Sequence, residues 1–213
     1  MFIIGLTGGI GTGKSEVAGI LQTLGATIIN ADKLSHKTYS RGTEGWKKVV
    51  EAFGASMLTA NGNINRHKLA NVVFKNNKAL KNLNSIVHPR THLAIEKCLS
   101  EFKQTRVSVV VIEAPLLVEA IRNQIHWTQL IHELWVTDVS ENLVIKRIQK
   151  RNNVGEQSII SRINSQIPRE ERNKYASVLI NNNGTPENLR EHVKILWQER
   201  VIPTKTNRVT NND

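Results

Sequence analysis

The chain has 213 residues, of which 39% are hydrophobic. This is enough for one α/β core, or for one core that carries a helical insertion, and short for two independent domains. No window approaches 18 consecutive apolar residues, which excludes a membrane-spanning helix. The formal charge of +11 would suit nucleic-acid binding, but Lys and Arg are spread along the chain without an aromatic stacking or zinc-finger motif, so we expect small polyanionic ligands instead.

The first predicted elements surround a glycine-rich loop. Residues 8–15 read GGIGTGKS and fit the phosphate-loop pattern G-x-x-x-x-G-K-[ST] at every specified position. The apolar run before the loop predicts a buried strand, and apolar residues at helical spacing after it predict a helix. Backbone N–H groups and a helix N-terminus then bind phosphate, with Lys14 reaching the β- and γ-phosphates and Ser15 ligating Mg²⁺. A glycine-rich turn without a ligand is the alternative.

A second strand is predicted at residues 26–29, and Asp32 follows its carboxyl end. Ligands bind at that edge of an open parallel sheet, so Asp32 is a candidate for chemistry. Alternatively, Asp32 only caps a helix that begins at Lys33.

From residue 42 to residue 87, helical spacing replaces the strand signals and predicts a helical insertion. Arg66 is expected in the first turn of one helix. His88 and Pro89 are expected to open another, because proline is favoured at the first helical position. His88 and His92 are spaced i, i+4, but no H-E-x-x-H pattern or paired cysteine accompanies them, so we favour a capping or substrate-facing His88 over a metal site.

The single cysteine, Cys98, can form no intramolecular disulfide. The N-terminus also lacks the basic and long apolar regions of a secretion signal. We therefore expect a cytoplasmic protein.

Three more strands are predicted, at residues 107–112, 130–136 and 178–180, which completes a five-stranded parallel sheet. Glu113 ends the third strand. A carboxylate at the end of a hydrophobic strand is a candidate to hold Mg²⁺ directly or through water. Thr185 is predicted to cap the last helix, and the polar residues 203–213 are expected to form a disordered tail.

Residues 141–172 carry Arg147 and Arg151 on one helix face. Such a run is usually a solvated surface. Next to a phosphate loop, however, a mobile helical lid can bring cations to the migrating phosphoryl group and exclude water. We therefore predict a lid over residues 141–172.

Taken together, these motifs resemble the dephospho-coenzyme A kinase family from residue 2 to about residue 197. The resemblance is carried by an ordered set of segments: GLTGGIGTGKS at 5–15, NAD at 30–32, Asn65 and Arg66 with Leu69, LNSIVHP at 83–89, EAPLLVE at 113–119 and INNNG at 180–184. The phosphate loop alone is common to many NTPases, whereas the ordered set is far more specific.

The resemblance implies transfer of the ATP γ-phosphoryl group to the ribose 3′-hydroxyl of dephospho-coenzyme A, with Mg²⁺ as cofactor, in the last step of coenzyme A synthesis. It implies that Asp32 is the base or orienter for that hydroxyl and acts with Lys14 and Arg147 in catalysis. The implied substrate-binding residues are Asp32, Arg66, His88, Glu113 and Arg147. The implied nucleotide-binding residues are Gly8, Gly9, Ile10, Gly11, Thr12, Gly13, Lys14, Ser15, Glu16 and Asn182, the last near the adenine.

The chain departs from the family pattern at three positions. The family commonly has Asp where this chain has Glu113, Phe where it has Val118, and Asp where it has Ser177. Ser15 and Glu113 are the expected Mg²⁺ ligands, and the longer acid moves its carboxylate by about one methylene, which can exchange direct ligation for a water-mediated contact. The same resemblance places Arg151 and Arg169 in the lid.

The expected architecture is a three-layer, P-loop NTPase-type α/β fold in a single kinase domain over residues 1–202. It has a helical acceptor-binding region at about 42–90 and a lid at about 141–172, in a monomer or small homo-oligomer. The alternatives are another P-loop nucleoside or nucleotide kinase and, less well supported, a nucleic-acid-associated P-loop NTPase. Arg66 and the pair His88-Pro89 favour the coenzyme A branch.

Overall fold

The computed structural model describes residues 1–152 and 154–203, so most of the predicted tail lies outside the described residues. The chain divides into two compact units. The first consists of residues 1–29 and the chain from residue 103 onward, and the second of residues 30–102. The region expected to bind the acceptor, at about 42–90, falls within the second unit.

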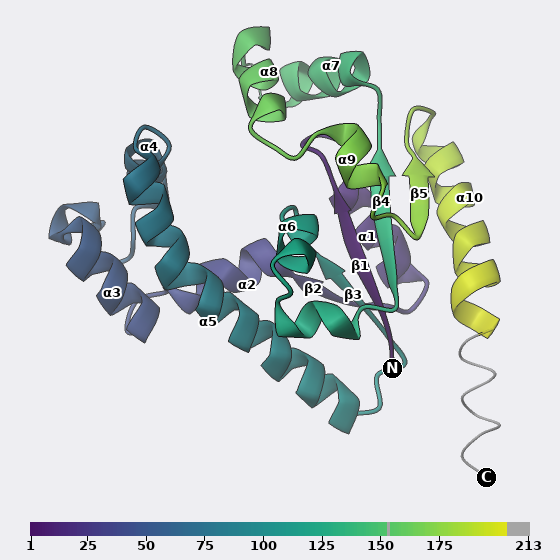
Figure 1. The fold of residues 1–213 in the computed structure, drawn as a ribbon, viewed down its shortest axis with the longest axis horizontal. Coiled ribbons are helices and arrows are strands. Elements are labelled where there is room, and N and C mark those ends of the chain that lie inside the picture. The colour runs from purple at the N-terminus through teal and green to yellow at the C-terminus, as the bar shows by residue number, and fades with distance from the viewer. Residues whose placement is uncertain (153, 204–213) are drawn as a thin grey trace. The chain divides into compact units, whose positions relative to one another are not determined.

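The first unit is built on a five-stranded sheet in the order β2-β3-β1-β4-β5 (Figure 1). Its strands are β1 (Phe2–Gly8), β2 (Thr27–Asn30), β3 (Val109–Glu113), β4 (Glu133–Asp138) and β5 (Val178–Asn181). The central strand β1 pairs in parallel with β3 and with β4, and β4 pairs in parallel with β5. The predicted parallel sheet is confirmed, although the fourth strand starts three residues later than expected.

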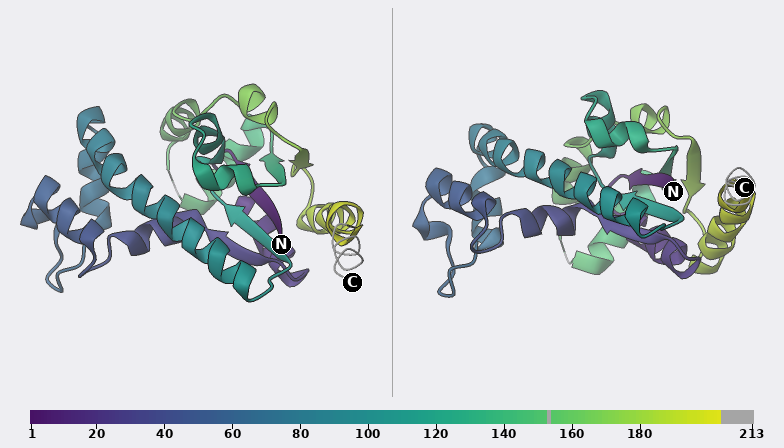
Figure 2. Two further views of the ribbon diagram at one scale, coloured as in Figure 1. Left: turned by 60° about the horizontal axis from the view of Figure 1, so that its bottom comes forward. Right: turned by 90° about the horizontal axis from the view of Figure 1, so that it is seen from below.

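Helices cover both faces of this sheet (Figure 2). On one face, α1 (Lys14–Thr23) and α10 (Pro186–Leu196) pack on alternate residues of β1, among them Ile4 and Leu6. Gly5 points to the opposite face, where an added Cβ would lie 2.8 Å from the side chain of Leu117 in α6 (Leu117–Arg122). The sheet between two helical layers is the predicted three-layer fold.

The remaining helices of the first unit lie between β4 and β5, while a 3₁₀ turn precedes β4 and a π-helical turn follows α10. They are α7 (Glu141–Asn152), α8 (Glu156–Asn164) and α9 (Arg169–Asn173), with a 3₁₀ turn at His126–Leu130 and a π-helical turn at Trp197–Val201. Thr185 caps α10 as predicted, because its side chain accepts from the Asn188 N–H while the Asn188 side chain accepts from the Thr185 N–H. No helix in the described ranges is long and apolar enough to cross a membrane.

The second unit is helical and has its own core. It contains α2 (Ala31–Thr38), α3 (Glu44–Phe53), α4 (Arg66–Val73) and α5 (Asn77–Gln104, which ends just beyond this unit), with a 3₁₀ turn at Ala55–Met57. Val49, Leu69 and Val87 are among the buried residues that these elements share. The start of α4 at Arg66 is as predicted, and the Asn65 side chain caps it by accepting from the Lys68 N–H at 3.0 Å.

The prediction that a helix begins at His88 is wrong, because α5 runs without a break through Pro89. A proline inside a helix removes one hydrogen bond and crowds the preceding turn, at a cost of about 3 kcal/mol. Buried residues continue at helical spacing on both sides of it, with Ile86 and Val87 before and Thr91 after. Burial along one continuous stripe therefore outweighs the local preference of proline for a helix start.

We predict that Pro89→Ala raises the free energy of unfolding by about 1–3 kcal/mol, because it restores an N–H inside α5. Chemical denaturation measures this change. Pro186→Ala is the matched control, since Pro186 lies in the first turn of α10 and its missing N–H has no helical acceptor. The control should change stability by less than about 0.5 kcal/mol. A destabilised Pro89→Ala variant would contradict the continuous helix.

Candidate functional site

The phosphate loop connects the central strand to α1, and its end is fixed by Asn182. Gly13 is the N-cap of α1 in the left-handed region, at φ 90°, which favours glycine. The buried Asn182 side chain, just after β5, donates from Nδ2 to the Thr12 carbonyl at 3.0 Å. A Cβ on Gly13 would collide with that amide, so the loop requires glycine there for space as well as for conformation.

Lys14 lies across the start of the loop. Its Nζ donates to the carbonyls of Gly8 and Gly9, each at 2.9 Å. The ammonium is thereby held beside the backbone that is expected to surround the phosphates.

Ser15 and Glu113 are brought into contact by the register of β1 and β3. Leu6 lies opposite Glu113, which is buried, and Ser15 Oγ donates to Glu113 Oε1 at 2.6 Å. A hydroxyl and a carboxylate oxygen are suitable ligands for Mg²⁺, which commonly binds one or two protein groups together with substrate phosphates and water. Among the described residues, no group of three His, Cys, Asp or Glu side chains could enclose a metal ion by itself. The pair therefore fits a metal shared with a phosphate.

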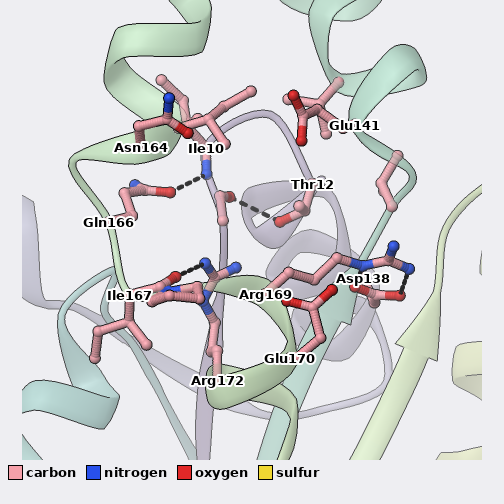
Figure 3. Close-up of a pocket in the computed structure, with 15 residues that line it drawn as sticks. Ile10, Thr12, Asp138, Glu141, Asn164, Gln166, Ile167, Arg169, Glu170 and Arg172 are labelled. Carbon is pink, nitrogen blue, oxygen red and sulfur yellow. Dashed lines mark hydrogen bonds and ion pairs between the residues drawn. The ribbon is translucent and has the colours of Figure 1, made fainter.

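A cavity of about 330 Å³ opens beside the loop (Figure 3). Gly9, Ile10 and Thr12 line it on the loop side. The end of β4, the helices α7, α8 and α9, and the segment between α8 and α9 line the rest. Gln166, between α8 and α9, accepts the Ile10 N–H at its Oε1 at 2.9 Å, which ties the expected lid segment to the loop (Figure 3).

Two arginines of α9 also line the cavity, and they are held differently. Arg169 makes a bidentate pair with Asp138 at the end of β4, with nitrogen–oxygen distances of 2.6 and 2.5 Å. Hydrogen bonding from Arg169 holds the pKa of Asp138 below its ordinary value, with a further hydrogen bond from Asn173. Arg172 is buried and donates from Nη2 to the Ile167 carbonyl at 2.7 Å.

Some residues predicted for the site do not line this cavity, and several residues that do line it were not identified from the sequence. Arg147, expected to face the phosphates, lies partly exposed on α7 and is not among the residues that line this cavity. Glu16 is exposed in the first turn of α1. Gln166 and Asp138 belong to no motif, and the only signal for Arg172 was its place in a charged run after Pro168.

In the second unit, Asp32 does not cap α2. The cap is Asn30, whose side chain accepts from the Lys33 N–H at 2.8 Å, and Asp32 lies in the first helical turn. The alternative in which Asp32 serves only as a helix cap is therefore wrong.

Arg66, Tyr39 and His36 lie close together in that unit. The Arg66 guanidinium is 5.9 Å from the centre of the Tyr39 ring, and the His36 ring meets the same ring edge-on at 5.9 Å. Burial lowers the pKa of His36, the charge of Arg66 lowers it further, and the charge of Asp32 acts in the opposite direction. Sequence reasoning named Asp32 and Arg66 but missed His36 and Tyr39, although the i, i+4 spacing of Asp32 and His36 on α2 was a signal.

His88 lies inside α5, so a capping role for it is wrong. Its ring centre is 6.1 Å from that of His92, one turn further along. Burial lowers the pKa of His88, which favours the neutral imidazole at neutral pH. A neutral imidazole can both donate and accept a hydrogen bond.

Comparisons with known proteins converge on one family. A sequence model of dephospho-CoA kinase matches residues 2–188. The dephospho-CoA kinase of Carboxydothermus hydrogenoformans is 40% identical over 197 residues, 92% of this chain and 93% of its own length. That of Dehalococcoides mccartyi is 38% identical over 202 residues, covering 94% and 98%. The solved dephospho-CoA kinase from Campylobacter jejuni superposes with a TM-score of 0.71 at 27% identity, covering 95% of this chain and 98% of its own.

The pair formed by Asp138 and Arg169 predicts a pH-dependent contribution to stability. Asp138→Asn should lower the free energy of unfolding by about 1 kcal/mol at pH 7, a small value because the Arg169 side chain is 47% exposed. The folded-state pKa of Asp138 is depressed below its unfolded value of about 3.9, so the contribution is complete above about pH 4 and is lost as pH falls through the folded-state pKa.

Urea denaturation of both proteins between pH 7 and pH 2.5 measures this difference. Arg169→Met removes the other half of the pair and should remove most of the same pH dependence, since the Asn173 hydrogen bond to Asp138 remains. A difference between the wild type and Asp138→Asn that stays constant down to pH 2.5 would contradict the prediction.

Proposed function

The chain belongs to the dephospho-CoA kinase family, and we propose that it transfers the γ-phosphoryl group of ATP to the ribose 3′-hydroxyl of dephospho-coenzyme A. The observation that carries this proposal is the phosphate loop between β1 and α1, with Ser15 in contact with Glu113 at 2.6 Å. It gives the chain a phosphate-binding backbone, a lysine and a pair of oxygen ligands in one place. The products are ADP and coenzyme A.

On the donor side, we propose that the loop N–H groups and the N-terminus of α1 bind the phosphates of ATP. The Lys14 ammonium donates to two loop carbonyls, and when ATP binds it also donates to the β- and γ-phosphate oxygens. Ser15 and Glu113 would hold Mg²⁺, which when bound neutralises charge on those phosphates. The family commonly has Asp at position 113. The contact with Ser15 supports the same role for Glu113, because its longer side chain still reaches the serine.

On the acceptor side, we propose that the Asp32 carboxylate acts on the 3′-hydroxyl. Asp32 does not cap α2, and its carboxylate can accept the proton of the hydroxyl or orient the hydroxyl for in-line attack. Arg66 is proposed to bind an anionic group of the acceptor, because its guanidinium is positioned on the Tyr39 ring. His88 is proposed as a neutral hydrogen-bonding group for the same substrate.

The lid and adenine assignments belong to the same proposal. Residues of α7, α8 and α9 line the cavity beside the loop, which supports a covering role for the lid at about 141–172. Arg147 does not line the cavity, so its proposed contact with the phosphates rests on the family resemblance. The Asn182 amide nitrogen already donates to the Thr12 carbonyl, which holds this residue beside the loop. Its proposed contact with the adenine therefore uses the side-chain oxygen.

A panel of acceptors separates this function from that of a nucleoside or nucleotide kinase. With Mg·ATP, we expect rapid ADP release with dephospho-coenzyme A and only background release with nucleosides, nucleoside monophosphates or nucleic acid. Lys14→Ala should lower kcat by at least about 10²-fold, because it removes charge that offsets the migrating phosphoryl. Preferred turnover with a nucleoside monophosphate, or wild-type turnover by Lys14→Ala, would contradict the assignment.

Asp32→Asn tests the role of that carboxylate in catalysis. The variant keeps the size of the side chain but loses the base and its charge, so kcat should fall by about 10² or more. Because Asn30 caps α2, the variant should fold normally, which circular dichroism and thermal unfolding can check. A correctly folded Asp32→Asn protein with kcat within a few-fold of the wild type would exclude a catalytic role.

A further inference from the structure

Arg172 is a buried cation without an ion pair in the described part of the chain. The residue is 9% exposed, and within residues 1–152 and 154–203 its side chain donates one hydrogen bond, to the neutral carbonyl of Ile167. Burial is the main cause that lowers its pKa, and the carboxylates of Glu119 and Asp138 act on it only through space. A buried charge held by a single carbonyl is costly unless a further anion contacts it.

The guanidinium rests directly on the phosphate loop. A Cβ added to Gly9 would lie 2.8 Å from Arg172 Nη1, so any larger residue at position 9 would displace the guanidinium from this place. Gly9 and Arg172 both line the cavity of about 330 Å³. Figure 3 shows Arg172 among the side chains of this cavity.

Neighbouring contacts fix Arg172 in this place. Gln166 is bonded to the Ile10 N–H at 2.9 Å, and the Ile167 carbonyl that accepts from Arg172 is the next residue along the chain. One turn earlier in α9, Arg169 has its guanidinium occupied by both oxygens of Asp138. Asp138, at the end of β4, is therefore already paired with Arg169, and Arg172 keeps N–H donors for another group.

These features define the ligand chemistry. A guanidinium carries five N–H donors in a fork that matches oxyanions, and the donors of Arg172 border a loop whose backbone binds phosphate. The N-terminus of α1 serves the inner phosphates of a nucleotide, and Lys14, which donates to the Gly9 carbonyl at 2.9 Å, serves the β- and γ-phosphates. Gly9, at the opposite end of the loop from α1, then borders the terminal phosphate.

We propose that Arg172 is a preset contact to the terminal phosphate of ATP, an inference that rests on the proposed function for the identity of the nucleotide. Arg172 contacts this phosphate in bound ATP before the reaction as well as during phosphoryl transfer. Binding should therefore discriminate ATP from ADP through this side chain.

Calorimetric titration with ATP and with ADP, at one fixed Mg²⁺ concentration and without acceptor, tests the proposal. For Arg172→Met we expect ATP affinity to fall by about tenfold or more and ADP affinity to stay within about twofold. Arg172→Lys keeps a point charge without the fork and should lose part of the ATP affinity. Arg190→Met removes an exposed arginine of α10 and is the control, with both affinities within about twofold.

Two outcomes would overturn the proposal. Equal losses for ATP and ADP would mean that Arg172 only shapes the loop, and unchanged ATP affinity would mean that it makes no phosphate contact. If Arg172→Met does not fold in a thermal unfolding assay, Arg172→Lys decides by the same ratio of ATP to ADP affinity. Because no acceptor is present, a wild type that fails to phosphorylate dephospho-coenzyme A would refute the proposed function and leave this comparison intact.

Discussion

The placement of β1 between β3 and β4 is the constraint on which the site depends. Because Leu6 lies opposite Glu113 and Gly8 lies opposite Thr137, the loop leaves the sheet with a carboxylate on one side and a hydroxyl on the other. Thr12 shares a hydrogen bond of 2.7 Å with Thr137, and Ser15 shares one of 2.6 Å with Glu113. The loop is thus held to both neighbouring strands by side chains that lie more than ninety residues away in sequence.

Much of this fold could be predicted because its signals are local. Short apolar runs, a loop with a fixed glycine pattern, and caps such as Asn65 and Thr185 depend on neighbouring residues alone. The continuation of α5 through Pro89 could not be predicted in the same way. It depends on burial of side chains on both sides of the proline, which is a tertiary effect that outweighs the local preference.

The candidate site divides along the same line. The meeting of Ser15 with Glu113 was predictable, because a loop after one strand and an acid ending another share an edge of a parallel sheet. The contact between Ile10 and Gln166 spans 156 residues and follows no motif. Arg172 was visible only as part of a charged run, and a sequence cannot tell whether such an arginine is solvated or buried until the fold has placed it beside Gly9.

The two arginines of α9 are held by different partners, and this difference bears on the proposed binding of phosphate. Arg169 is neutralised by Asp138, so it adds little net field to the cavity. Arg172 is held by a carbonyl, which fixes its geometry but leaves its charge in place. A cation that is ordered before the ligand arrives loses little conformational entropy on binding, and its burial strengthens the interaction with an incoming anion. The cost of burying Arg172 in the free protein is therefore offset when phosphate binds.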